Sequence, residues 1–199
     1  MAALLHPSLG EEAVAEARDL LALLHDMPRH WPTLARDQIL DAAHCEAALR
    51  AAAMRALGAP QQYAAGRAAF RHLTLDVDER VLIPRPETEQ LVEIVLELSR
   101  AKRGGVVVDV GTGSGAIALS LASEGRFSKV IGTDVSLDAL AVAGANAARF
   151  EGRWCAKVEL RHGSLLGPVS EKGLYAVVSN PPYIAFDEAA ALPASVRDW

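Results

Sequence analysis

The chain has 199 residues, of which 51% are hydrophobic and 23% charged, and its net charge is −5. This composition is typical of a globular protein and excludes the disordered and fibrous classes. The acidic balance argues against a protein that wraps nucleic acid through phosphate contacts, and two cysteines provide neither a disulfide framework nor a cysteine zinc cluster. No apolar stretch is long enough for a membrane span. We therefore expect a soluble cytoplasmic protein without membrane or metal partners.

The first part of the chain is expected to be helical. Apolar residues at three- and four-residue spacing predict a helix that ends before Pro28. A short helix over residues 34–40 and a longer one over residues 42–57 follow, and no strand is predicted before Leu73. These elements predict a helical domain over residues 1–72. The apolar stripe of the first helix consists of Val14, Ala17, Leu20, Leu21 and Leu24.

From residue 73 onward, short apolar runs alternate with helical patterns. This alternation indicates βαβ units and a parallel sheet. We therefore predict an α/β domain of the doubly wound, Rossmann-like type over residues 73–199. Glu87 and Glu89 are expected to be first-turn acids that the helix dipole favours. The strands are expected at residues 73–77, 106–110, 129–133, 158–161 and 174–179, and the helices at residues 87–100, 115–123 and 137–150, the last with Ser136 as its N-cap.

Three glycines follow the strand at residues 106–110. Gly111, Gly113 and Gly115 would let a ligand approach the backbone closely and would supply amide donors at a helix N-terminus. Asp134 ends the next strand, where a carboxylate can accept hydrogen bonds from ribose hydroxyls. Strand, glycines, helix and acid in this order predict a nucleotide site. The loop alone leaves NAD open as the ligand, because Ala116 also fits the third position of the dinucleotide pattern.

Asp109 precedes the glycine loop by two residues and favours one ligand class. An acid at the end of this strand is expected to face the charged tail of the ligand. It would suit the cationic end of S-adenosylmethionine and repel a pyrophosphate. We therefore expect S-adenosylmethionine rather than NAD.

The stretch from Asn180 to Tyr183, with the sequence Asn-Pro-Pro-Tyr, follows the last predicted strand. Because Pro181 and Pro182 have no N–H and a fixed φ, the backbone carbonyls of Asn180 and Pro181 are free to accept hydrogen bonds at defined positions. Asn180 adds a side-chain carbonyl. Together with the ring of Tyr183 they would form a socket for a planar NH₂ group. Such a socket aligns a weakly nucleophilic nitrogen with an electrophilic methyl group.

These motifs together resemble a known family. The glycine loop followed by the Asn-Pro-Pro-Tyr stretch is similar to class I S-adenosylmethionine-dependent amino-methyltransferases. The segments Ile83-Pro-Arg-Pro-Glu-Thr-Glu89 and Pro60-Gln-Gln-Tyr-Ala-Ala-Gly66 narrow the resemblance to the PrmC/HemK family. The resemblance implies methyl transfer to the side-chain amide of the glutamine in the Gly-Gly-Gln loop of peptide chain release factors. It also implies that the helical domain docks the release factor, the expected protein partner.

The resemblance also implies site residues. Asn180, Pro181, Pro182 and Tyr183 would hold the substrate amide. The chain departs from the family after the third strand of the sheet, where Ser164 replaces an acidic residue and Leu165 would pack on the adenine ring. The cofactor site would then consist of Asp109, Gly111, Thr112, Gly113, Ser114, Gly115, Asp134, Ser164, Leu165 and Asn180.

Three alternatives stay open. The first is methyl transfer to an exocyclic amine of a DNA or RNA base, for which Arg50, Arg55 and Arg67 are the candidate contacts. The second is an inactive truncated remnant, because the family continues with three more strands after residues 175–179. In that case we expect an unpaired apolar strand edge, poor solubility and little activity. The third, an NAD oxidoreductase, leaves the Asn-Pro-Pro-Tyr stretch unexplained.

The cofactor assignment can be tested by titration calorimetry. The protein is expected to bind S-adenosylmethionine and S-adenosylhomocysteine but not NAD, because Asp109 would disfavour a pyrophosphate. Tighter binding of NAD would contradict the assignment.

Overall fold

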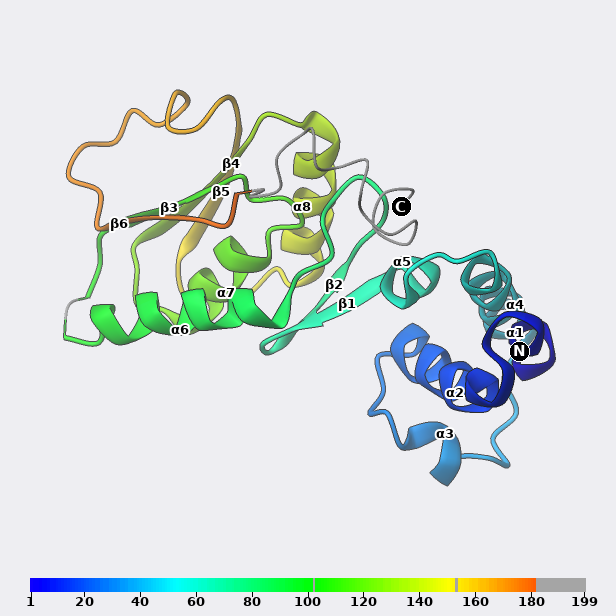
Figure 1. The fold of residues 1–199 in the computed structure, drawn as a ribbon. Helices are drawn as coiled ribbons and strands as arrows, with labels where there is room; N and C mark the ends of the chain where they lie inside the picture. Colours follow the sequence, from blue (N-terminus) through cyan, green and yellow to red (C-terminus); the bar gives the residue numbers. More distant parts are fainter. Residues whose placement is uncertain (102, 153, 182–199) are drawn as a thin grey trace. The chain divides into compact units, whose positions relative to one another are not determined.

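The computed structural model describes residues 1–101, 103–152 and 154–181 (Figure 1). One compact unit is formed by residues 1–68, and a second begins at Ala69. The division therefore falls slightly before the expected boundary at residue 72. No helix among the described residues is long and apolar enough to cross a membrane.

The first unit consists of short helices packed through small residues. Its core includes Leu5, Leu20, Ala51 and Ala52, and the alanines allow close approach of the helices. The expected stripe is partly confirmed, because Ala17 and Leu20 are buried whereas Val14 is half-exposed. The elements are α1 (Ala2–Leu9), η1 (Gly10–Glu12), α2 (Ala13–Leu24), α3 (Trp31–Leu34), α4 (Ala42–Ala56) and α5 (Gln61–Ala65).

Some helix predictions in this unit were wrong. The helix expected at residues 34–40 is instead α3, which ends at Leu34. Pro32 lies in its first turn, where a missing N–H costs no helix hydrogen bond, so this proline starts a helix rather than preventing one. α1 and α5 were not predicted, because each is too short for a clear apolar period.

The sequence predicted the second strand of a hairpin, at residues 73–77, but missed the first. β1 (Arg67–Phe70) pairs with β2 (Leu73–Asp76). The sequence of β1 is rich in alanine, which has low strand propensity, so the fold of β1 depends on pairing with β2. Arg71 in the turn has a positive φ of 51°. Phe70 and Leu75 of the hairpin are buried in the core of the second unit.

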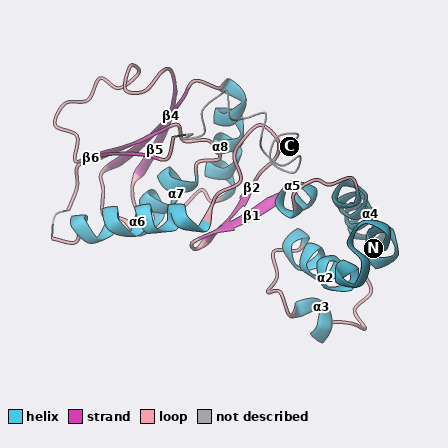
Figure 2. Cartoon of the chain, in the orientation of Figure 1, coloured by secondary structure: helices cyan, strands magenta, loops and turns pink. Residues whose placement is uncertain are grey.

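The second unit is a Rossmann-like α/β domain, as predicted (Figure 2). Among the described residues, its main sheet has four parallel strands in the order β5-β4-β3-β6. Ser136 caps α8 as expected, because its side chain accepts a hydrogen bond from the Ala139 N–H at 3.1 Å. The elements are β3 (Val106–Val110), β4 (Lys129–Asp134), β5 (Lys157–His162), β6 (Ala176–Ser179), α6 (Pro86–Ser99), α7 (Ala116–Glu124) and α8 (Leu137–Arg149).

β3 is the central strand and is buried on both faces. Val107 packs in the cluster that includes residues of α6 and α7, whereas Val108 packs with Ile131 in a second cluster. Within the described part of the chain, β6 is an outer strand, and its Val177 is half-exposed. The chain runs from β3 toward β5 on one side and returns to β6 on the other. The carboxyl ends of β3 and β6 therefore flank a topological switch point, where such sheets bind ligands.

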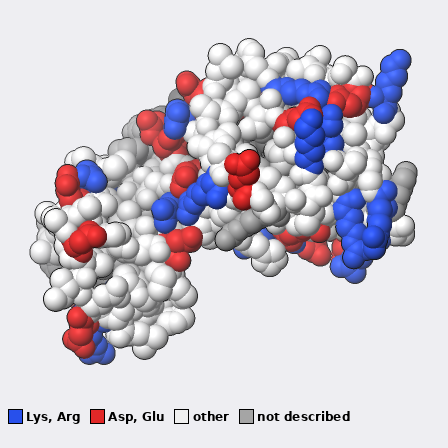
Figure 3. Space-filling model, turned by 180° about the vertical axis from the view of Figure 1, so that it is seen from behind, with Lys and Arg blue, Asp and Glu red and all other residues white. Residues whose placement is uncertain are grey.

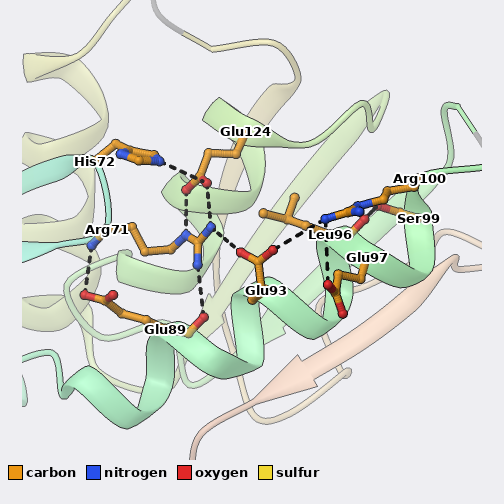
Figure 4. Close-up of polar contacts among 9 residues, drawn as sticks. All are labelled: Arg71, His72, Glu89, Glu93, Leu96, Glu97, Ser99, Arg100 and Glu124. Carbon is orange, nitrogen blue, oxygen red and sulfur yellow. Dashed lines mark hydrogen bonds and ion pairs between the residues drawn. The ribbon is translucent and has the colours of Figure 1, made fainter.

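Arg71 connects the hairpin to two helices (Figure 4). Its guanidinium binds the Glu124 carboxylate of α7 through two hydrogen bonds of 2.8 and 2.7 Å. It also donates to Glu93 at 2.8 Å and to the carbonyl of Glu89 at 3.2 Å, both on α6. The side chains of Arg71 and Glu124 are 12% and 15% exposed, so this pair is well shielded from water.

Replacing Arg71 with Met is expected to lower the free energy of unfolding of the second unit by roughly 2–4 kcal/mol, because it leaves the carboxylate of Glu124 partly buried without its cation. Native-state hydrogen exchange of the β3 amides measures this free energy. As a control, Arg80→Met removes an exposed ion pair with Asp78 and should cause no measurable change. Equal exchange rates in the two variants would contradict a stabilising role of Arg71.

Candidate functional site

The glycine loop between β3 and α7 leaves open space at its backbone. Gly111 and Gly113 have φ values of 72° and 55°, and nothing lies within 4 Å of the position that a Cβ would take at either residue. A ligand can therefore come close to this stretch of backbone.

The amide groups of the loop are largely occupied. The N–H groups of Gly111 and Thr112 both donate to the Thr133 carbonyl, at 2.8 and 2.9 Å. The Gly113 N–H donates to Asp134 Oδ2 at 2.9 Å, and the Gly115 N–H donates to the Thr112 carbonyl at 2.8 Å. The expectation that these glycines supply donors to the ligand was therefore wrong. A loop with these amides engaged is poorly suited to a pyrophosphate, which needs several free N–H groups.

Asp109 is placed differently from the prediction. Its side chain is fully buried and does not face the ligand cavity. Oδ2 accepts hydrogen bonds from the Thr112 hydroxyl at 2.7 Å and from the Ala118 N–H at 3.1 Å. The N-cap of α7 is Gly115, which has no side chain to accept a hydrogen bond. The Asp109 carboxylate instead accepts from the free Ala118 N–H in the first turn of α7 and so caps this helix.

Burial raises the pKa of the Asp109 carboxyl to about 6, and the negative charge of Asp134 adds to the increase. The hydrogen bonds from Thr112 and Ala118 act in the opposite direction. Its Oδ1 has no hydrogen-bond partner among the described residues. The carboxylate that holds the loop therefore carries an unfavourable desolvation free energy.

Asp134 lies at the carboxyl end of β4, beside the loop. Oδ2 accepts from the Gly113 N–H, and Oδ1 accepts from the Ser136 N–H at 3.0 Å. A carboxylate has about four lone-pair sites, so two backbone donors leave acceptor capacity for a ligand hydroxyl. The position of Asp134 is compatible with the expected ribose contact.

Asn146 is a residue of the site region that the sequence did not single out. It is fully buried on α8 and donates to the Ser114 carbonyl at 2.9 Å. Its other contacts are to Asp76 of β2, whose N–H and carbonyl it binds at 2.7 and 3.0 Å. It thus joins the glycine loop to the hairpin. Nothing in the sequence distinguishes this Asn from a helix-surface residue, because its partners are distant backbone groups.

A cavity of about 190 Å³ collects many of the predicted residues at the carboxyl edge of the sheet. This is smaller than the roughly 300 Å³ or more typical of ligand pockets, so it would hold part of a nucleoside-sized ligand. The lining does not include Asp109, Thr112, Gly113, Ser114 or Gly115. It does include the predicted Gly111, Asp134, Ser164, Leu165, Asn180 and Pro181, together with Val110, Thr133, Val135, Gly163 and Ser179.

Leu165 contributes an exposed apolar surface to this cavity. It has a positive φ of 49°, a conformation that is unfavourable for leucine, and its side chain is 68% exposed. The Thr133 hydroxyl donates to the Leu165 carbonyl at 2.9 Å and holds the segment in place. An exposed leucine in a strained conformation suits contact with a planar ring.

The Asn-Pro-Pro-Tyr stretch begins at the carboxyl end of β6. Asn180 and Pro181 line the cavity, and Ser179 anchors the strand end by donating to the Val110 carbonyl at 2.8 Å. Asn180 Nδ2 donates to the Thr88 hydroxyl of α6 at 2.9 Å. The predicted Pro182 and Tyr183 lie outside the described residues.

The parallel sheet, the glycine loop and the cavity at the switch point, together with the family match of the same residues, define a class I S-adenosylmethionine-dependent methyltransferase domain. Residues 87–193 match the family described as methyltransferase small domain. The chain belongs to this family.

Similarity to curated proteins confirms the predicted resemblance to the PrmC/HemK family. The chain is 42% identical over 176 residues to the release factor glutamine methyltransferase of Lactococcus lactis, covering 87% of this chain and 62% of that protein. It is 45% identical over 150 residues to the protein of the same name from Koribacter versatilis, covering 75% of this chain and 52% of that protein. The chain thus spans between half and two thirds of these relatives.

Among solved structures, the ribosomal protein L11 methylase of Lactobacillus delbrueckii is 33% identical, with a TM-score of 0.42 and coverage of 49% of this chain and 47% of that one. S-adenosylmethionine is the cofactor of the class I methyltransferases to which this domain belongs. The described residues fit it through the open backbone at Gly111, the acceptors of Asp134 and the apolar surface of Leu165.

The burial of Asp109 predicts that the free energy of unfolding depends on pH. Since its pKa rises from 3.8 in the unfolded chain to about 6 in the fold, ionisation costs stability as the pH increases between these values. The free energy of unfolding of Asp109→Asn relative to the wild type should therefore increase by roughly 2 kcal/mol between pH 4 and pH 6, at about 1.4 kcal/mol per pKa unit and less near each pKa. Urea unfolding at several pH values measures this difference. A difference that is independent of pH would show that Asp109 does not titrate in this range.

Proposed function

We propose that this protein transfers a methyl group from S-adenosylmethionine to the side-chain amide nitrogen of the glutamine in the Gly-Gly-Gln motif of peptide chain release factors. The observation that carries the proposal is the position of Asn180 and Pro181. They lie at the carboxyl end of β6 and line the same cavity as Asp134 and Leu165. The names of the relatives support the release factor as substrate.

When bound, S-adenosylmethionine supplies an electrophilic methyl group on a sulfonium. Asp134 would accept hydrogen bonds from its ribose, and Leu165 would pack on its adenine. Ser164, exposed in the same loop, offers the adenine amino group a neutral acceptor. These contacts orient the methyl group but do not themselves react.

The side-chain carbonyl of Asn180 and the backbone carbonyl of Pro181 would accept the two hydrogens of the substrate amide. The lone pair of an amide nitrogen is delocalised, so the nitrogen is a weak nucleophile. Acceptors on its hydrogens stabilise the positive charge that develops as the new C–N bond forms. They also hold the nitrogen in line with the methyl group. The proton can leave after the transfer, so this mechanism assigns no general base.

A protein substrate is better supported than a nucleic acid base. The arginines expected to contact nucleic acid already bind groups of the helical unit: Arg50 pairs with Glu46, and Arg55 pairs with Glu16 at 2.6 Å. Arg67 donates to the Leu24 carbonyl at 3.1 Å. On the face shown in Figure 3, most of the surface is white, and in several places Lys and Arg atoms lie beside Asp and Glu atoms. We also propose, from the resemblance to the PrmC/HemK family, that the helical unit docks the release factor.

Asn180→Ala is expected to lower the rate of methyl transfer to a release factor by about 10²-fold or more, the scale for removing a positioned transition-state partner. The affinity for S-adenosylmethionine, measured by calorimetry on the same variant, should barely change, because the Asn180 side chain is expected to face the substrate amide rather than the bulk of the cofactor, and it serves as the control. Transfer is followed with labelled cofactor and a release factor that contains the Gly-Gly-Gln loop. Near-normal turnover of the variant would remove Asn180 from the mechanism, and preferential methylation of oligonucleotides by the wild type would replace the proposed substrate.

A further inference from the structure

Asn180 is held by a residue from a distant part of the chain. Its Nδ2 donates to Thr88 Oγ1 at 2.9 Å, although the two residues are 92 positions apart. Thr88 lies in the first turn of α6 and is 9% exposed. The hydroxyl can donate or accept a hydrogen bond; here it is nearly buried at the start of α6 and accepts from Asn180 at the end of β6.

The start of α6 is itself fixed in place. The backbone N–H of Arg71 donates to Glu89 Oε1 at 3.0 Å, and its guanidinium binds the Glu89 carbonyl and the Glu93 carboxylate (Figure 4). Glu89 therefore has a specific tertiary partner in addition to its favourable place near the helix N-terminus. Because Thr88 directly precedes Glu89, these contacts limit the movement of the Thr88 hydroxyl relative to the sheet.

In the structure the Thr88 hydroxyl accepts from Nδ2, and this contact holds the Asn180 amide in one of its two orientations. The terminal torsion of asparagine is broad and has two nearly equivalent orientations. With Nδ2 on Thr88, Oδ1 points away from α6 and accepts no hydrogen bond from the described residues. In the opposite orientation, an N–H group would face the substrate NH₂ group, and two donors would meet.

We propose that Thr88 is a positioning residue that fixes the side-chain amide of Asn180 so that Oδ1 faces the substrate nitrogen. This inference rests on the proposed function, because it assumes that Asn180 binds the substrate amide. It also gives the segment Ile83-Pro-Arg-Pro-Glu-Thr-Glu89 a part in substrate recognition through Thr88.

The activity test compares Thr88→Val with Thr88→Ser. Valine keeps the shape of threonine but removes the hydroxyl, so kcat/KM for the release factor should fall about tenfold, the scale of one neutral hydrogen bond. Serine keeps the hydroxyl and should restore most of the activity. Thr74→Val makes the same replacement on β2 and should leave kcat/KM unchanged. The affinity for S-adenosylmethionine should be the same in all variants.

A double-mutant cycle shows whether Thr88 acts through Asn180. In an Asn180→Ala background, Thr88→Val should cause no further loss, because the group that it positions is absent. Additive losses would overturn the inference. A loss in Thr88→Ser as large as that in Thr88→Val would also overturn it, because the hydroxyl would then not be the important group.

A third measurement does not depend on activity. In the wild type, the side-chain NH₂ resonances of Asn180, assigned by their loss in Asn180→Ala, should include one proton that exchanges slowly with water. Thr88→Val should shift both resonances and speed this exchange, whereas Thr74→Val should not. Unchanged resonances in Thr88→Val would overturn the inference. A wild type that methylates no release factor would refute the proposed function, while these resonances would still decide the contact between Thr88 and Asn180.

Discussion

The buried carboxylate of Asp109 is the interaction on which the geometry of the site depends. It lies at the end of the central strand and binds both the Thr112 hydroxyl and the Ala118 N–H. One side chain thereby fixes the loop to the strand and caps the helix that follows. The raised pKa of this carboxyl shows that desolvation opposes the arrangement. Two well-aligned donors partly offset that cost and leave the loop backbone open toward the ligand.

The other parts of the site are supported from outside the βαβ units. Asn146 joins the glycine loop to β2, and Arg71 joins the turn of the same hairpin to α6 and α7. The hairpin therefore connects the cofactor loop with the helix that presents Thr88 to Asn180. Rigid support of this kind suits methyl transfer to a weak nucleophile, because the reaction depends on alignment more than on acid–base chemistry.

The engaged amides of the glycine loop help to separate two ligand classes that share the same motif. A dinucleotide site uses free N–H groups to bind a pyrophosphate. Here the N–H groups of Gly111, Thr112 and Gly113 bind Thr133 and Asp134 instead. The loop offers space and leaves polar recognition to side chains such as Asp134. A loop with an open backbone and engaged amides is compatible with a sulfonium nucleoside. This geometry explains the preference for S-adenosylmethionine over NAD better than the position of Asp109 in the sequence does.

The sequence by itself determined the order of strands and helices in the second unit, the cap at Ser136 and the segments that meet at the sheet edge. These features follow from local patterns, because apolar runs, glycines and caps act within a few residues. Tertiary structure alone decided the burial of Asp109, the pairing of the alanine-rich β1 and the partners of Asn146 and Thr88. Each of these depends on groups that are distant in the chain. The sequence position of Asp109 allows its carboxylate either to face a ligand or to cap a helix. Only the packing of the folded chain decides between these two roles.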